Sequence, residues 1–167
     1  PSEILQKIYR KIKIGFDPKL FSEASLLNNF KTTNNELISI EQNLIDKIWL
    51  KKPKIKIKKF FILKSKHVGK DYKSKIKSVC NVIKKKKINK LLITAPENLA
   101  WLLNIRGKDS KHSPLPNCQA VLDSDEKITL VVNKNKINTK FKLHFKNILN
   151  YIEPSYFPEY LKSLNCT

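Results

Sequence analysis

Short apolar segments, whose spacing alternates between that of a helix and that of a strand, are the strongest constraint on the fold of this chain. Residues 2–13 and 19–31 carry apolar side chains three and four positions apart, which is typical of an amphipathic helix. Residues 13–16 and 36–40 are short apolar segments that predict strands. Strands that alternate with helices indicate a sheet on which helices pack. We therefore expect an α/β fold in which helices flank a mixed β-sheet.

The rest of the chain continues this alternation. Residues 71–87 predict a helix with Cys80 on its apolar face. Residues 96–103 predict another helix, in which Trp101 packs inward together with its leucine neighbours. We expect the other elements at these places: a short helix at 43–49, a linker at 50–59 that can hold an edge strand at 54–58, a strand at 90–94, a loop at 104–116, a hairpin of strands at 118–122 and 127–132, a strand at 141–145 and a helix near 155–164.

The length of 167 residues suits one domain. We expect a single domain over residues 1–167, with a leading helix at 1–13, a core at 14–150 and an exit segment at 151–167. The apolar content of 41% is too high for a disordered polycation. No apolar segment approaches the roughly 18 residues of a membrane-spanning helix, so we expect no membrane partner. The chain starts at Pro1 without a methionine, which we interpret as a fragment boundary.

The three cysteines, Cys80, Cys118 and Cys166, are odd in number and widely spaced. None belongs to a CxxC pair, which argues against a disulfide framework and against a zinc site. This cysteine usage predicts a reducing cytoplasm as the compartment of the protein.

The formal charge of +20 results from 34 basic and 14 acidic side chains, but its composition is unusual. Only Arg10 and Arg106 are arginines, and the other basic residues are lysines. Nucleic-acid binders usually rely on arginine, whose planar fork fits phosphates and guanine edges. The excess of Lys, Ile and Asn therefore favours a codon bias over selection for an anion-binding face, and we do not expect nucleic acid as a partner. A lysine-rich module that binds nucleic acid or another polyanion stays open as an alternative, with a steep salt dependence as its signature.

No catalytic centre can be identified in the sequence. The three histidines, His67, His112 and His144, have no partner at metal-ligand spacing. No GxSxG, Walker or GxGxxG motif occurs. Cys80 and Cys118 lack the adjacent base that an activated thiol requires. We therefore expect no catalytic residue and no metal ligand within this segment.

One segment carries a specific resemblance. Residues 94–122 read TAPENLAWLLNIRGKDSKHSPLPNCQAVL. They resemble the AWLLNIRGxD…P signature in the non-catalytic region of three-domain Xaa-Pro aminopeptidases, the aminopeptidase P family of the creatinase/prolidase superfamily. Three further segments are similar to family elements and follow the family order: GFDP within residues 14–18, NLIDKIWLKKP at residues 43–53 and the start of the helix at residues 72–76.

The resemblance implies a creatinase/prolidase N-terminal-like fold with its ribonuclease H-like motif. It implies that this chain is the middle, non-catalytic domain of an Xaa-Pro aminopeptidase, which removes the N-terminal residue from peptides with proline second. Two divalent metal ions, typically manganese, would then lie in a pita-bread catalytic domain of the same polypeptide. Proline-containing peptides would be the other partners, and a homodimer is left open. By itself this segment would be inactive.

The resemblance also suggests site residues. Arg106, Asp109 and His112 are the candidates for the substrate entrance, because the N-terminal domains of the family wall that entrance. Each candidate has a plainer interpretation: Arg106 and Asp109 could pair and brace the loop, and His112 could be a solvated loop residue. Residues 111–116 depart from the family pattern. A stand-alone adaptor that lacks the catalytic domain is a third hypothesis.

Overall fold

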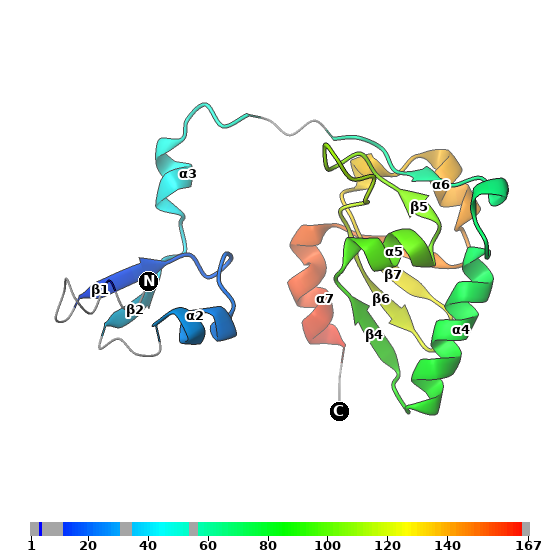
Figure 1. Ribbon diagram of the computed structural model, residues 1–167, viewed down its shortest axis with the longest axis horizontal. Coiled ribbons are helices and arrows are strands. Elements are labelled where there is room, and N and C mark those ends of the chain that lie inside the picture. The colour runs from blue at the N-terminus through cyan, green and yellow to red at the C-terminus, as the bar shows by residue number, and fades with distance from the viewer. Residues whose placement is uncertain (1–3, 5–11, 31–34, 54–56, 165–167) are drawn as a thin grey trace. The chain divides into compact units, whose positions relative to one another are not determined.

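The computed structural model of the chain describes residue 4 and residues 12–30, 35–53 and 57–164. It divides the chain into two compact units, Pro1–Lys54 and Ile55–Thr167 (Figure 1). The expected helix at 2–13 falls almost entirely outside the described residues, as do three residues of the possible edge strand at 54–58. The single domain expected over residues 1–167 stays a prediction.

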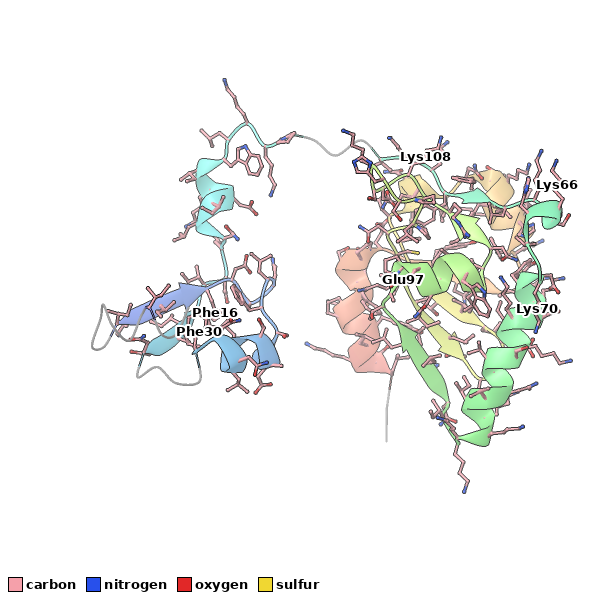
Figure 2. The ribbon with its side chains drawn as sticks, in the orientation of Figure 1. Phe16, Phe30, Lys66, Lys70, Glu97 and Lys108 are labelled. Atoms are coloured by element: carbon pink, nitrogen blue, oxygen red, sulfur yellow. The ribbon has the colours of Figure 1, made fainter. Side chains whose placement is uncertain are left out.

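The first unit is built on a two-stranded parallel sheet. Its elements are β1 (Lys13–Phe16), α2 (Glu23–Phe30), β2 (Glu36–Ser39) and α3 (Leu44–Ile48). The strands and α3 confirm the expected elements, whereas α2 begins four residues later than predicted, at Glu23. None of the described side chains of this unit is buried, and the aromatic rings of Phe16 and Phe30 lie here (Figure 2).

Two of the family-like segments meet in this unit. The Asn43 side chain accepts hydrogen bonds from the backbone N–H groups of Ile45 and Asp46, which caps α3. The same side chain donates to Asp17 over 2.8 Å. This hydrogen bond is the main cause of the lowered pKa of Asp17. The GFDP turn and the start of the NLIDKIW element are therefore joined by one side-chain contact.

The second unit contains a mixed four-stranded sheet in the order β4-β6-β7-β8 and a small antiparallel pair, β3-β5. Only β7 and β8 run parallel. The elements are β3 (Phe61–Ile62), α4 (Tyr72–Lys85), β4 (Lys90–Ile93), α5 (Pro96–Leu102), β5 (Ile105–Arg106), β6 (Gln119–Asp123), β7 (Ile128–Val131), α6 (Thr139–His144), β8 (Leu149–Ile152) and α7 (Phe157–Ser163), with short 3-10 turns at Ser65–His67, Lys134–Lys136 and Pro154–Tyr156. The α/β fold with a mixed sheet and flanking helices is as expected.

Helix α4 illustrates why the sequence forms these elements. Asp71 accepts hydrogen bonds from the Ser74 hydroxyl and from the Ser74 backbone N–H, which cap the first turn and lower the pKa of Asp71. Ile76, Cys80 and Ile83 form the buried stripe. Lysines at its end lie near the negative pole of the helix dipole. The predicted helix at 71–87 is confirmed to within two residues.

The hydrophobic core lies on one face of the sheet. Alternate strand residues such as Ala120, Leu122 and Leu130 are fully buried there, against side chains of α4, α5 and α6. Thr129 points to the opposite face, where its hydroxyl accepts a hydrogen bond from the Tyr160 hydroxyl of α7 over 3.0 Å. The sheet is thus covered on both faces, with α4 and α7 on its two sides (Figure 1).

One predicted element is wrong. Residues 141–145 form helix α6 and the turn after it, not a strand. The segment FKLHF fits both periods, because its phenylalanines are four apart and its apolar residues also alternate. Phe141 and Phe145 are buried while Leu143 is 66% exposed, which is the helical pattern. Asn138 decides the outcome locally by capping the Phe141 N–H.

The strand β8 was not predicted, whereas the helix near 155–164 is confirmed as α7. Among the helices that the structure describes, none has the length and apolarity needed to cross a bilayer.

Candidate functional site

The site is built around the end of α5, in the middle of the signature segment. Pro96 occupies the first turn, where a missing N–H costs no helical hydrogen bond. Leu99 and Leu102, and Leu103 after them, anchor the helix in the core. The chain then turns at Asn104, whose φ of 54° is a left-handed conformation that asparagine tolerates well.

Two cations hold the carbonyl groups at this helix end. The Lys75 ammonium donates to the carbonyl of Trp101 over 2.7 Å and to the side-chain oxygen of Asn104. The Arg106 guanidinium donates to the carbonyls of Ala100 and Ile105 over 2.9 and 2.8 Å. Ala100 and Trp101 lie in the last turn of α5, at the negative pole of the helix dipole, and Ile105 follows in β5. The end of α5 is therefore a rigid base for the loop that follows.

Lys75 is itself unusual, because only 5% of its surface is exposed. Burial lowers its pKa, and the positive charge of Arg106 lowers that pKa further. The ammonium also lies 4.5 Å from the centre of the Trp101 ring. The inward packing predicted for Trp101 is wrong, since the ring is 55% exposed. Trp101 covers the buried lysine from outside rather than filling the core.

Close backbone contact shapes the next part of the loop. The Gly107 N–H donates to the Pro114 carbonyl over 2.9 Å. A Cβ at Gly107 would lie 2.6 Å from the Leu115 carbonyl oxygen and 2.7 Å from the Pro116 Cα. Both are backbone atoms that cannot rotate away, so the loop closes on itself only with glycine at this position.

Asp109 braces the same loop from the other side. Its carboxylate pairs with the Lys136 ammonium at 2.9 Å, and the two side chains are only 17% and 14% exposed. The second carboxylate oxygen accepts from the Asn117 N–H over 2.8 Å. Lys136 also lies 5.5 Å from the Phe60 ring centre. Asp109 therefore ties the loop to the 3-10 turn that ends at Lys136.

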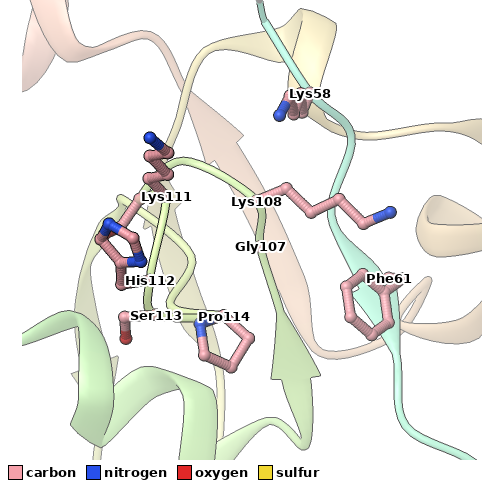
Figure 3. A pocket seen from close by; sticks show the side chains of 9 residues that line it. Lys58, Phe61, Gly107, Lys108, Lys111, His112, Ser113 and Pro114 are labelled. Atoms are coloured by element: carbon pink, nitrogen blue, oxygen red, sulfur yellow. The ribbon is translucent and has the colours of Figure 1, made fainter.

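The tip of the loop lines a pocket of about 410 Å³ (Figure 3). Lys108, Lys111 and His112 lie on the loop side, and Lys58 and Phe61 line it from the segment around β3. An adjoining hollow of about 660 Å³ shares Lys58, Phe61 and Lys108 with it.

The structure thus separates the three predicted site residues. Arg106 faces backbone carbonyls, Asp109 faces Lys136, and His112 alone lines the pocket. Within the described part of the chain, no ion pair joins Arg106 to Asp109, so the pairing considered for them is wrong. Both nevertheless brace the loop, through different partners. His112, for which the plainer interpretation was a solvated loop residue, is the candidate with access to a ligand.

No catalytic chemistry can be assigned to the residues described. They bring no three His, Cys, Asp or Glu side chains together in a group that could hold a metal ion. The two divalent ions that the resemblance places in a catalytic domain therefore find no fitting donor set among the residues described here. Cys80 and Cys118 are buried free thiols. Burial raises the pKa of both, for Cys118 to about 12, which opposes thiolate formation.

The lysines of the site were not predicted from the sequence. Lys75 had a detectable signal, because it lies three residues after Tyr72 and four before Val79 and thus interrupts the apolar stripe of α4. Lys108, Lys111 and Lys136 had none, since each is one lysine among many in a chain of this composition.

Comparison with known proteins shows which family the chain belongs to. A family model for the creatinase/prolidase N-terminal domain matches residues 51–166. The chain is 32% identical over 138 residues to a probable Xaa-Pro aminopeptidase P of Pyricularia oryzae, and this match covers 80% of the chain and 22% of that protein. It is 32% identical over 140 residues to aminopeptidase P2 of Arabidopsis thaliana, and this match covers 81% of the chain and 20% of that protein. The chain thus spans only about a fifth of these relatives.

A solved structure agrees on the fold. The X-prolyl aminopeptidase of Caenorhabditis elegans, described as a cytosolic enzyme with a di-nuclear active site, matches with a TM-score of 0.81 at 23% identity. The match covers 96% of this chain and 26% of that protein. The signature segment and its loop lie within the residues that the family model matches, and on this evidence the chain belongs to the creatinase/prolidase N-terminal domain family.

Proposed function

We propose that this chain is the middle, non-catalytic domain of a cytoplasmic Xaa-Pro aminopeptidase, which removes the N-terminal residue from peptides that have proline second. The observation that carries the proposal is the loop of residues 107–117. It leaves a helix end held by Lys75 and Arg106, is tied down by Asp109, and presents its tip beside an open pocket. The aminopeptidase names of the relatives support the same assignment.

In this proposal the loop is a wall of the substrate entrance. A wall must keep its shape while peptides pass, and the bracing contacts provide that rigidity at little entropic cost on binding. His112 then faces the passing peptide, whereas Arg106 and Asp109 position the loop without touching it. The domain would limit the entrance to short peptide N-termini and take part in assembly, including any homodimer.

The chemistry itself belongs to the catalytic domain of the same polypeptide. There two divalent metal ions, manganese by resemblance, would supply Lewis-acid activation for peptide hydrolysis. The residues described here contribute positioning and access, not bond cleavage, so this chain by itself should be inactive.

The test uses the parent polypeptide with and without metal. Purified with Mn²⁺, it should release free alanine from Ala-Pro-Ala and should lose this activity after chelation. The 167-residue chain with the same metal should release none. A parent polypeptide that cleaves no Xaa-Pro peptide would overturn the proposed function, and turnover by the chain alone would overturn its non-catalytic assignment.

A further inference from the structure

We propose that the pocket beside the loop tip binds the carboxylate of a short peptide, with Lys108 and Lys111 as its charged contacts. That the ligand is a peptide rests on the proposed function, whereas the preference for a carboxylate rests on the pocket itself. Figure 3 shows Lys108, Lys111 and Lys58 around the opening, with Lys108 extended toward Phe61.

The first step of the argument is unused positive charge. Lys58, Lys108 and Lys111 are exposed, and within the part of the chain that the structure describes none has a hydrogen bond or an ion pair through its ammonium group. By contrast, Lys75, Lys90 and Lys136 are all engaged. Three free ammonium groups around one concavity raise the local concentration of anions.

The second step concerns the counter-charge. No acidic side chain lines the pocket or the adjoining hollow. Asp109 belongs to the same loop, but its two oxygens are occupied by Lys136 and by the Asn117 N–H. The fold thus withdraws the one loop carboxylate from the pocket, and a bound anion has no internal competitor for the lysines.

The third step is the apolar part of the lining. Phe61 is 41% exposed, and Pro114 of the loop also lines the pocket. An apolar surface beside the cations suits a carboxylate attached to an apolar residue better than a bare ion. A volume of about 410 Å³ is sufficient for a terminal residue and its neighbour.

The geometry favours a peptide over a nucleic acid. Single-stranded nucleic acids require successive aromatic platforms along a basic track. Here Phe61 and His112 line a single open concavity, and the described lining residues provide no series of aromatic rings along a track. A peptide can offer two sources of carboxylate, its C-terminus or an acidic side chain, and the experiment separates them.

Binding of the 167-residue chain should be measured by fluorescence anisotropy with three labelled peptides. They are Ala-Pro-Leu-Leu with a free C-terminus, its C-terminal amide, and the amide of Ala-Pro-Leu-Glu. We expect the free acid to bind about tenfold more tightly than the amide. Tight binding of the glutamate peptide as well would assign the site to any carboxylate, and its weak binding would assign the site to the C-terminus. Equal affinity for all three peptides would overturn the proposal.

A matched pair of variants shows where the carboxylate binds. Lys108→Gln/Lys111→Gln should abolish the preference for the free acid, whereas Lys77→Gln/Lys85→Gln removes the same charge from exposed positions of α4 and should change the affinity less than about twofold. Equal losses in both double variants would show a generic polycation effect and overturn the site. Pocket-dependent binding of a ten-nucleotide oligothymidylate that is tighter than peptide binding would overturn it in favour of nucleic acid.

The two proposals can fail separately. A parent polypeptide that cleaves Ala-Pro-Ala, combined with a chain that shows no carboxylate preference, would refute the pocket alone. A clear preference combined with an inactive parent would refute the proposed function and leave the pocket as a carboxylate site. Melting temperatures of the variants, expected within a few degrees of the unchanged chain because all four lysines are exposed, serve as the folding control.

Discussion

Side chains at the end of α5 show how position on a helix decides the role of a residue. Leu99 and Leu102 face the core, whereas Trp101 follows Leu99 by two residues and so lies about 200° around the helix from it. Its exposed fraction of 55% follows from that position. The ring is large and apolar, but its contact is the cation of Lys75. The residue type of Trp101 predicts a position in the core, whereas the helical period predicts the exposed position that the structure shows.

We therefore expect Trp101→Ala to cost little stability. The loss of one partly exposed cation–π contact should lower the free energy of unfolding by about 1 kcal/mol. Leu102→Ala, the adjacent and buried control, should cost about 2–5 kcal/mol. Urea denaturation of both variants checks the difference, and equal losses would place Trp101 in the core after all.

Because of Cys118, we expect the free energy of unfolding to fall at alkaline pH. Burial raises its pKa from 9.0 to about 12, so the folded thiol holds its proton more tightly than the unfolded one. This contribution is complete below pH 9 and is lost as pH rises from about 9 toward 12. Between pH 8 and pH 10 the free energy of unfolding of the chain should fall by about 1.4 kcal/mol more than that of the Cys118→Ala variant. Urea midpoints at both pH values measure this, and parallel losses in the two proteins would contradict the buried, protonated thiol.

At the scale of elements, the sequence predicts segments with one clear period and fails where two periods fit. Helix α4 and the hairpin β6–β7 were predicted because their apolar spacing and turn residues agree. Residues 141–145 were not, because FKLHF satisfies both helix and strand until Asn138 caps the helix. The loop predicted at 104–116 was located together with its glycine, except that Ile105 and Arg106 form the short strand β5. The partners of Arg106 and Asp109 were missed, since tertiary contacts leave no periodic signal.

The loop itself should depend on Gly107. An alanine there would force its Cβ into the backbone of Leu115 and Pro116, so Gly107→Ala should lower the free energy of unfolding by about 1–3 kcal/mol. Gly69 is the internal control, because a Cβ there meets nothing within 4 Å. Gly69→Ala should be neutral or slightly stabilising. Thermal melts of the two variants test this difference. A Gly107→Ala variant with unchanged stability would mean that the loop does not close as described.

At the scale of the whole molecule, the buried residues are distributed unevenly. The hydrophobic core runs from Phe60 to Leu149, entirely within the second unit, and the described residues of the first unit contribute none. The fold class and the family could be predicted from sequence, because a few motifs in order identify them. The division into two units could not, since apolar spacing shows which faces are buried but not against which partner.

This distribution leads to a folding test. A chain shortened to residues 55–167 keeps every buried hydrophobic residue described, so it should unfold cooperatively with a melting temperature within about 5 °C of the complete chain. Circular dichroism follows the transition. A shortened chain that is unfolded or melts without cooperativity would support the single domain over residues 1–167 instead.

The role proposed for the braced loop is to limit access to the active site of the parent polypeptide. The most direct measurement is the ratio of kcat/KM for a decapeptide to that for a tripeptide, both with proline second. Asp109→Asn removes the ion pair with Lys136 and loosens the loop, whereas Asp123→Asn removes the matched pair with Lys90, at the far end of β6 from the loop. We expect Asp109→Asn to raise this ratio about threefold or more and Asp123→Asn to leave it unchanged. An unchanged ratio in Asp109→Asn, or an equal change in both variants, would contradict this role.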